Sequence, residues 1–146
     1  MRIAVCDDLK EERKKVIEAL HSVIREFSAD EFDDGGELLR RHALLHYDLI
    51  ILDIIMPKLG GMETAAKLRI TDTETPVVFL SDTSEFGVQS YRVLAFDYLL
   101  KPIDTEQLRA CMRRFFMRKK QKDFLTVTYS GTETKIPLQN IQCLES

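Results

Sequence analysis

The stretch Asp48-Leu49-Ile50-Ile51-Leu52-Asp53 decides the fold. Four large apolar residues stand in an unbroken run between two aspartates. Such a run is typical of a strand buried on both faces of a parallel sheet, because a half-exposed strand would alternate apolar and polar residues. Two further runs of the same kind are Ile3-Ala4-Val5-Cys6 and Pro76-Val77-Val78-Phe79-Leu80.

Helical patterns separate these runs. From about Leu9 to Phe27, apolar residues recur at three- and four-residue spacing and predict an amphipathic helix. The remaining predicted elements are a weaker strand at Ser28–Phe32, helices at Gly36–Leu45, Met62–Arg69 and Ser84–Leu94, a strand at Asp97–Leu100, and a last helix capped by Asp104. Strand and helix alternate five times with short connections, so the sequence predicts an α/β fold with a doubly wound parallel sheet.

Length and composition narrow the class of protein. The chain has 146 residues, of which 45% are hydrophobic and 31% charged, with a net charge of −3. These values suit about one domain, exclude a disordered chain or a disulfide scaffold, and argue against nucleic-acid binding by the whole surface. Cys6, Cys111 and Cys143 form no CxxC pair, and no apolar run approaches the roughly 20 residues of a membrane span. We expect a cytoplasmic protein with no membrane contact and no zinc site.

Polar side chains follow four of the predicted strands. Asp7-Asp8 comes after the first, Asp53 after the third, Ser81-Asp82 after the fourth and Lys101-Pro102 after the fifth. In a doubly wound sheet, sites form outside the carboxyl ends of the strands. Taken singly, each residue has an ordinary explanation; Asp8 with Glu11, for example, would form a capping box.

Together these residues indicate a chemistry. Two like charges about 4 Å apart repel by roughly 4 kcal/mol at an effective dielectric constant near 20. Asp7, Asp8 and Asp53 at adjacent strand ends would be costly unless something neutralises them. A hard divalent cation such as Mg²⁺ offsets that repulsion, and Lys101 can pair with an anion. The combination describes a carboxylate that accepts a phosphoryl group, with cation and lysine balancing the charge on its oxygens.

These residues resemble the receiver domain of two-component response regulators. The motifs are Asp7-Asp8, Leu52-Asp53-Ile54-Ile55-Met56-Pro57 with Gly61, Ser81, and Ala95-Phe96-Asp97-Tyr98-Leu99-Leu100-Lys101-Pro102. The similarity covers roughly residues 1 to 120 in the correct order and spacing. It implies a flavodoxin-like sheet of strand order 2-1-3-4-5, a receiver domain at residues 1–121, and a signalling protein rather than an enzyme.

The same resemblance implies roles for the acidic residues. Asp53 would accept the phosphoryl group from the phosphohistidine of a sensor histidine kinase. Asp7, Asp8, Asp53 and the main-chain carbonyl of Ile55 would hold Mg²⁺.

Three further residues would respond to the phosphoryl group. Lys101, before a cis bond to Pro102, would contact it, and Ser81 would swing toward it. Tyr98 would change rotamer with Ser81 and alter the face formed by the fourth helix, the fifth strand and the fifth helix, where two copies of the chain can pair.

Two positions leave alternatives open. Asp82 stands where the family usually has a small residue, which leaves room for a pseudo-receiver that serves only as an interaction module. Ile55, two residues after the acceptor, stands where a Mg²⁺-dependent phosphohydrolase with an aspartyl nucleophile would need an acid. In a receiver, we expect its branched side chain to hinder attacking water and to lengthen the life of the acyl phosphate.

The end of the chain has a different character. Phe124–Tyr129 alternate with period two, a turn follows at Ser130-Gly131-Thr132, and Thr134-Lys135-Ile136 read as a second short strand, which predicts a β-hairpin. Together with Gln139–Ser146, this pattern resembles the opening of a LytTR-type DNA-binding domain, placed at residues 122–146 and mostly missing. The resemblance implies a transcriptional regulator that binds DNA through the full-length LytTR domain. Residues 1–146 alone are expected not to bind DNA sequence-specifically.

The remaining candidates are expected to be structural. His21, His42 and His46 have no metal-ligand spacing and are expected at the surface. Cys6 and Cys111 are expected to be small core residues rather than nucleophiles.

Overall fold

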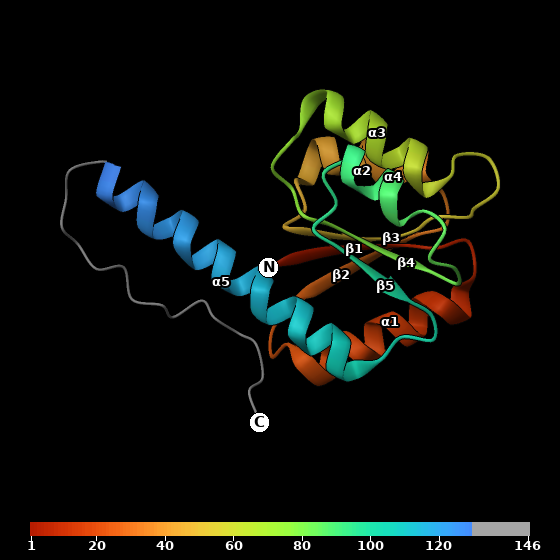
Figure 1. Cartoon of the computed structure of the whole chain (residues 1–146), viewed down its shortest axis with the longest axis horizontal. Helices are drawn as coiled ribbons and strands as arrows, with labels where there is room; N and C mark the ends of the chain where they lie inside the picture. The colour runs from red at the N-terminus through yellow and green to blue at the C-terminus, as the bar shows by residue number, and fades with distance from the viewer. Residues whose placement is uncertain (130–146) are drawn as a thin grey trace.

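The computed structural model describes residues 1–129. Strands and helices alternate along this part of the chain (Figure 1). The elements are β1 (Arg2–Cys6), α1 (Lys10–Val23), β2 (Ser28–Phe32), α2 (Gly35–Leu45), β3 (Leu49–Asp53), α3 (Gly61–Thr71), β4 (Val77–Ser81), α4 (Gly87–Arg92), β5 (Asp97–Leu100) and α5 (Thr105–Tyr129).

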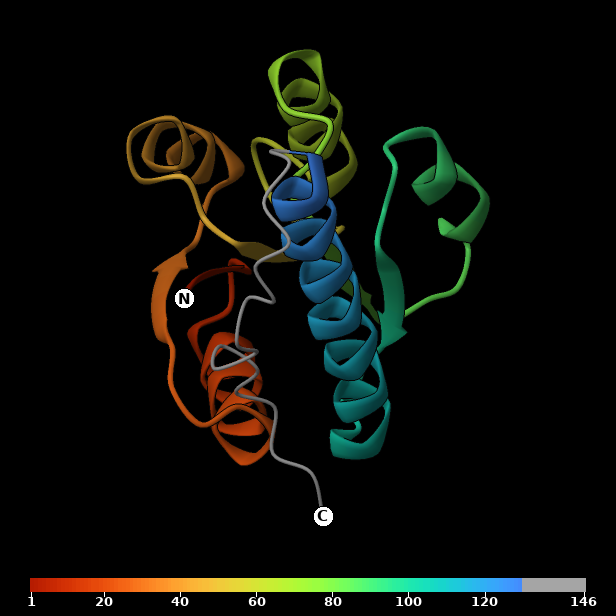
Figure 2. The same cartoon turned by 90° about the vertical axis from the view of Figure 1, so that its left-hand side faces the viewer.

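The sheet has the predicted topology. Its five strands are all parallel and follow the order β2-β1-β3-β4-β5. Helices α1 and α5 lie side by side on one face, and α2, α3 and α4 cover the other (Figures 1 and 2). The loops that follow β1, β3, β4 and β5 gather at one edge of the sheet, on the right of Figure 1. The prediction of a doubly wound α/β fold is therefore confirmed.

Side-chain alternation along the strands divides the core into two layers. In β3, Leu49 and Ile51 pack with residues of α1 and α5, whereas Ile50 and Leu52 pack with residues of α2 and α3. All residues of β3 are buried, as its unbroken apolar run predicts. Burial of apolar surface stabilises the folded state by about 25 cal/mol per Å². Because β3 is buried on both faces, it holds Asp53 at its end in a fixed position.

Helix ends differ in detail from the prediction. Helix α1 ends at Val23, before Phe27, and α4 covers only Gly87–Arg92 of the expected Ser84–Leu94. Asp104 caps α5 as predicted, because its side chain accepts two main-chain N–H bonds at 2.8 and 3.3 Å. The residue before α1 is Leu9, and no side chain caps that helix, so the capping box of Asp8 does not form.

The strand expected at Phe124–Tyr129 is wrong, because these residues belong to α5. A helix that has already formed gains one hydrogen bond for each residue added, whereas a strand needs a neighbouring strand to pair with. The expected turn, the second strand and the stretch Gln139–Ser146 lie outside the described residues. Among the helices that are described, none combines the length and apolar composition needed to cross a membrane.

Candidate functional site

The parallel sheet brings the strand-end residues together. Asp7 directly follows β1, and Asp53 and Ser81 are the last residues of β3 and β4. Lys101 directly follows β5, and its main-chain N–H donates to the carbonyl of Ser81 at 2.7 Å. Residues far apart in the chain therefore share one edge of the sheet, as the sequence predicts.

Three carboxylates form an acidic cluster at this edge. Oxygens of Asp7, Asp8 and Asp53 lie within 4.8 Å of one another. Asp7 is 3% and Asp53 8% exposed, so water screens their charges poorly. The Asp7 carboxylate also accepts the main-chain N–H of Leu9 at 3.0 Å, which fixes its orientation. The set consists of hard oxygen donors that leave room for water ligands, and it fits a Mg²⁺ ion.

Lys101 provides a positive charge against this cluster. Its Nζ atom donates to Asp7 Oδ2 at 2.9 Å and lies 3.6 Å from Asp53 Oδ1. The peptide bond between Lys101 and Pro102 is cis, as expected. Burial lowers the pKa of Lys101, but the hydrogen bond to Asp7 and the charges of Asp53, Asp7 and Glu12 outweigh burial and raise it above its ordinary value. The ammonium is therefore fully charged at neutral pH.

Asp53 has an unusual protonation equilibrium. Burial, followed by the charge of Asp7, raises the pKa of Asp53 to about 6. The opposite effects of Lys101 and of the Ile54 N–H, which donates to Asp53 Oδ1 at 2.9 Å, are smaller. Asp53 is ionised at neutral pH, but in surroundings that favour charge neutralisation. A cation bound beside this carboxylate would stabilise its charged form.

The loop after Asp53 is held by a glycine at the start of α3. The Gly61 N–H donates to the carbonyl of Ile54 at 2.7 Å. A Cβ atom at Gly61 would lie 2.1 Å from the carbonyl oxygen of Asp53, far inside contact distance. Only glycine allows this close approach of the helix to the strand end.

Ser81 and Tyr98 are linked through the loop after β4. The Thr83 N–H donates to Ser81 Oγ at 3.3 Å, and the Tyr98 hydroxyl donates to the carbonyl of Thr83. Ser81 is buried, and the half-buried Tyr98 ring lies 6.4 Å from that of Phe79. The loop between β4 and α4 is therefore tied to the side chains of both strands.

The two residues that left alternatives open both lie at the surface. Asp82 is exposed to water. Ile55 is 64% exposed although it is branched and apolar. Water therefore screens the charge of Asp82, and Ile55 is an exposed residue of the loop that follows Asp53.

Glu12 is a residue of this edge that the sequence prediction missed. Its Oε2 atom lies 4.0 Å from Lys101 Nζ. The signal was available, because Glu12 is four residues after Asp8, one turn along the predicted helix. Arg13, which was also missed, donates to the carbonyl of Asp7 at 2.7 Å and pairs with Glu31 at 3.0 Å. It ties the end of β1 to β2.

His42 contradicts the expectation of a surface histidine, although His21 and His46 are exposed as expected. His42 is 5% exposed, and its Nε2 lies 2.8 Å from Asp72 Oδ2. Burial raises the pKa of the Asp72 carboxyl, but hydrogen bonds from Thr75, His42 and Glu74 outweigh it and hold the pKa well below its ordinary value.

Two of these histidines belong to a second group of possible metal ligands. His42, His46 and Asp72 are close enough to share an ion. However, His42 Nδ1 accepts the main-chain N–H of Tyr47 at 3.0 Å, so the proton of the neutral ring is on Nε2, where a metal would bind. The cluster joins the end of α2 to the loop before β4.

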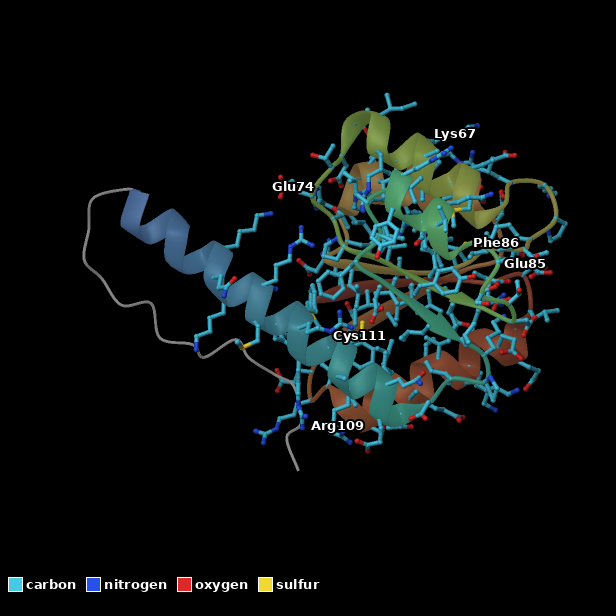
Figure 3. The ribbon with its side chains drawn as sticks, in the orientation of Figure 1. Lys67, Glu74, Glu85, Phe86, Arg109 and Cys111 are labelled. Carbon is cyan, nitrogen blue, oxygen red and sulfur yellow. The ribbon has the colours of Figure 1, made fainter. Side chains whose placement is uncertain are left out.

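The cysteines of the described residues are inert core groups, as predicted. Burial raises the pKa of the Cys6 thiol to about 12 and raises that of Cys111 as well. Cys111 lies on α5 toward the sheet (Figure 3) and packs in the core shared with α1. Neither thiol forms a reactive thiolate at neutral pH.

Comparison with known proteins decides the family. Residues 3–113 match the response regulator receiver domain family. This chain is a response regulator receiver domain. The receiver is 36% identical over 92 residues to an uncharacterised response regulatory protein of Vibrio cholerae, a match that covers 63% of this chain and 38% of that protein. It therefore spans well under half the length of that relative.

Solved structures agree with this assignment. The response regulatory domain of mrkE from Klebsiella pneumoniae has the same fold, with a TM-score of 0.75, 24% identity, and coverage of 83% of this chain and 99% of that one. The response regulator TrrA from Thermotoga maritima, solved in complex with Mg²⁺–BeF, has a TM-score of 0.70 and 27% identity over 78% of this receiver and 97% of that chain. The receiver is thus a module of two-component signalling.

Proposed function

We propose that this receiver is a phosphorylation-controlled switch in which Asp53 accepts a phosphoryl group from the phosphohistidine of a sensor histidine kinase. The observation that carries the proposal is the position of Asp53. Its carboxylate is 8% exposed, 3.6 Å from Lys101 Nζ, and within 4.8 Å of Asp7 and Asp8 oxygens. The nucleophilic carboxylate of Asp53 thus lies between the Lys101 ammonium and the acidic cluster, where a metal cation can bind.

The transfer uses few groups of the protein. A carboxylate oxygen of Asp53 attacks the phosphorus, the N–P bond of the phosphohistidine breaks, and its electron pair returns to the imidazole. Lys101 lies close enough to Asp53 to contact the oxygens of the transferred group and to balance their negative charge. The Ile54 N–H, at 2.9 Å from Asp53 Oδ1, orients the nucleophile.

Mg²⁺ is the cofactor that the donor set fits. Asp7, Asp8, Asp53 and the main-chain carbonyl of Ile55 would hold the ion. When bound, it supplies positive charge to the phosphoryl oxygens and removes the repulsion within the acidic cluster.

The output face is the surface of α4, β5 and α5. Ser81 and Tyr98 both contact the Thr83 segment that leads into α4, so a change at Ser81 reaches this face directly. Exposed apolar residues of these elements and of the loop after α4 are Val88, Tyr91, Leu94, Leu100 and Met117. We propose that phosphorylation changes this face, where two copies can pair.

The proposed output is transcription. The pattern from Ile136-Pro137-Leu138 to Leu144-Glu145-Ser146 supports a LytTR-type domain that begins after α5. DNA would then be bound by the full-length LytTR domain and not by residues 1–146, in a cytoplasmic regulator. A salt-sensitive, sequence-selective gel shift with residues 1–146 would contradict this.

Phosphoryl incorporation tests the switch. The chain is incubated with Mg²⁺ and acetyl phosphate, and separately with its phosphorylated kinase, and intact mass is measured with Asp53→Asn as the control. We expect one phosphoryl group on the parent chain and none on the variant. Failure with both donors would favour a pseudo-receiver. Repeated turnover of phosphate esters would favour a phosphohydrolase, which the absence of an acid at Ile55 disfavours.

A further inference from the structure

The Lys101 ammonium has a third carboxylate neighbour outside the acidic cluster. Besides Asp7 at 2.9 Å and Asp53 at 3.6 Å, Glu12 Oε2 lies 4.0 Å away. Both Lys101 and Glu12 have shielded side chains, 9% and 24% exposed. The charge of Glu12 therefore acts on Lys101 through a partly water-excluded space.

The Glu12 side chain is held in place from both ends. It belongs to the first turn of α1, directly after the loop that carries Asp7 and Asp8. Its Oε1 atom lies 3.4 Å from Lys15 Nζ, one turn farther along the helix, while Oε2 is directed at Lys101. Glu12 therefore bridges a surface lysine and the lysine of the site.

We infer that Glu12 is a positioning residue that competes with the phosphoryl group for Lys101. The inference rests on the proposed function, because Asp7 and Asp53 are the carboxylates that would engage Mg²⁺. With these two engaged, Glu12 is the remaining carboxylate beside Lys101, and its Oε2 atom faces the ammonium while Oε1 faces Lys15. It holds the ammonium toward α1 and repels a dianionic group arriving at Asp53.

This role predicts effects of opposite sign on two ligands. Without the Glu12 charge, Lys101 is free to contact a phosphoryl group or its mimic, so anion binding tightens. The same loss makes the acidic edge less negative, so Mg²⁺ binding weakens. A variant with a distorted site would instead bind both ligands more weakly.

The test compares Glu12→Gln with Glu11→Gln. Gln keeps the size of the side chain, and Glu11 is an exposed carboxylate of the same helical turn, so both variants lose one charge at the start of α1. Mg²⁺ binding is measured by calorimetry. Beryllofluoride binding at saturating Mg²⁺ is then measured by ¹⁹F NMR.

We expect Glu12→Gln to bind beryllofluoride about two- to fivefold more tightly than the parent and Mg²⁺ more weakly by a similar factor, the range of a partly exposed ion pair. Glu11→Gln should change both constants much less. Equal shifts in the two variants, or weaker binding of both ligands by Glu12→Gln, would overturn the inference while leaving the switch intact. A parent chain without Mg²⁺-dependent beryllofluoride binding would overturn the proposed function and the inference together.

Discussion

Asp53 carries a charge that its surroundings disfavour. The carboxylate is nearly fully buried beside Asp7, and its pKa is raised to about 6 despite Lys101 at 3.6 Å. Without a cation, the folded protein keeps this unfavourable charge at neutral pH, whereas the unfolded chain carries it in water. The acceptor residue therefore lowers the stability of the metal-free protein.

Replacing Asp53 with asparagine should stabilise the metal-free protein. The carboxyl group of Asp53 has a pKa of about 6 in the folded protein, against 3.8 for an ordinary aspartate. Between these pH values the folded protein binds more protons than the unfolded chain, so the free energy of unfolding falls as the pH rises. At pH 7 we expect Asp53→Asn to raise the free energy of unfolding by about 1–3 kcal/mol, and near pH 4 by almost nothing. Urea unfolding in EDTA at both pH values measures this.

The control for this measurement is Asp82→Asn. Asp82 is an exposed carboxylate after the neighbouring strand, so its replacement should change stability little at either pH. A stabilisation by Asp53→Asn that is as large at pH 4 as at pH 7 would show that charge is not its cause.

A second prediction for a single residue concerns Ile55 and the lifetime of the acyl phosphate. Ile55 belongs to the loop that follows Asp53, and its side chain is 64% exposed. In this place it can shield an acyl phosphate from water. We expect Ile55→Asn, which replaces a branched apolar side chain by one that can orient water, to speed dephosphorylation roughly tenfold, or about 1.4 kcal/mol of barrier. The loss of the phosphorylated form is followed by intact mass. An unchanged rate would show that Ile55 does not determine the lifetime of the acyl phosphate.

At the scale of elements, the junction between β3 and α3 determines where the acceptor lies. The strand supplies rigidity because all its residues are buried, and the helix begins against the strand end through Gly61. The Gly61 N–H bond to Ile54 at 2.7 Å closes the intervening loop. A change at this junction should therefore displace Asp53 itself.

Gly61→Ala tests the junction. Its Cβ would lie 2.1 Å from the Asp53 carbonyl oxygen and 2.8 Å from Ile54 Cα, and both are main-chain atoms that cannot move independently. We expect a loss of about 1–3 kcal/mol in stability together with slower phosphorylation of Asp53. Chemical denaturation and acetyl phosphate labelling measure the two effects.

The matched control is Gly60→Ala, one residue earlier. A Cβ at Gly60 would meet the Ile54 carbonyl at 3.2 Å, and the backbone φ of −70° suits alanine. It should fold and be phosphorylated nearly as the parent chain. If Gly61→Ala behaves like Gly60→Ala, the junction does not position the acceptor.

At the scale of the whole molecule, folding and the site depend on each other. Lys101 and Asp7, which are in contact, are 94 residues apart in the chain. The unfolded chain therefore has no preformed cation site, and a cation that binds the acidic cluster stabilises the folded state. In the metal-free protein, the burial of apolar side chains on both faces of the sheet offsets the repulsion among the clustered carboxylates.

Adding Mg²⁺ should raise the melting temperature of the parent chain. Binding to the folded state alone contributes about 2.7 kcal/mol at a free concentration one hundred times the Kd. Differential scanning calorimetry with and without EDTA measures the change, with Na⁺ at matched ionic strength as the control. Asp8→Asn should lose most of the gain, and an equal gain in that variant would place the ion elsewhere.

The resemblance to receiver domains implied the strand order, and the sequence pattern itself predicted the parallel sheet and the gathering of Asp7, Asp8, Asp53 and Lys101. The sheet and the gathering depend on unbroken apolar runs and on the rule that parallel strands end at one edge. The prediction failed at Phe124–Tyr129, where period-two alternation was outweighed by extension of α5. The roles assigned to the site residues remain predictions that the experiments above test.

Local pattern predicted several features that depend on neighbours in the chain: which segments are buried, the cap of Asp104 on the last helix, and the approximate end of each strand. Packing of distant elements decided the rest. The approach of Glu12 to Lys101, the burial of His42 against Asp72, and the close contact at Gly61 follow from how helices lie on the sheet. Periodicity specifies which face of a helix is buried, but not the distance between two side chains on different elements, because that distance depends on the packing of the whole core.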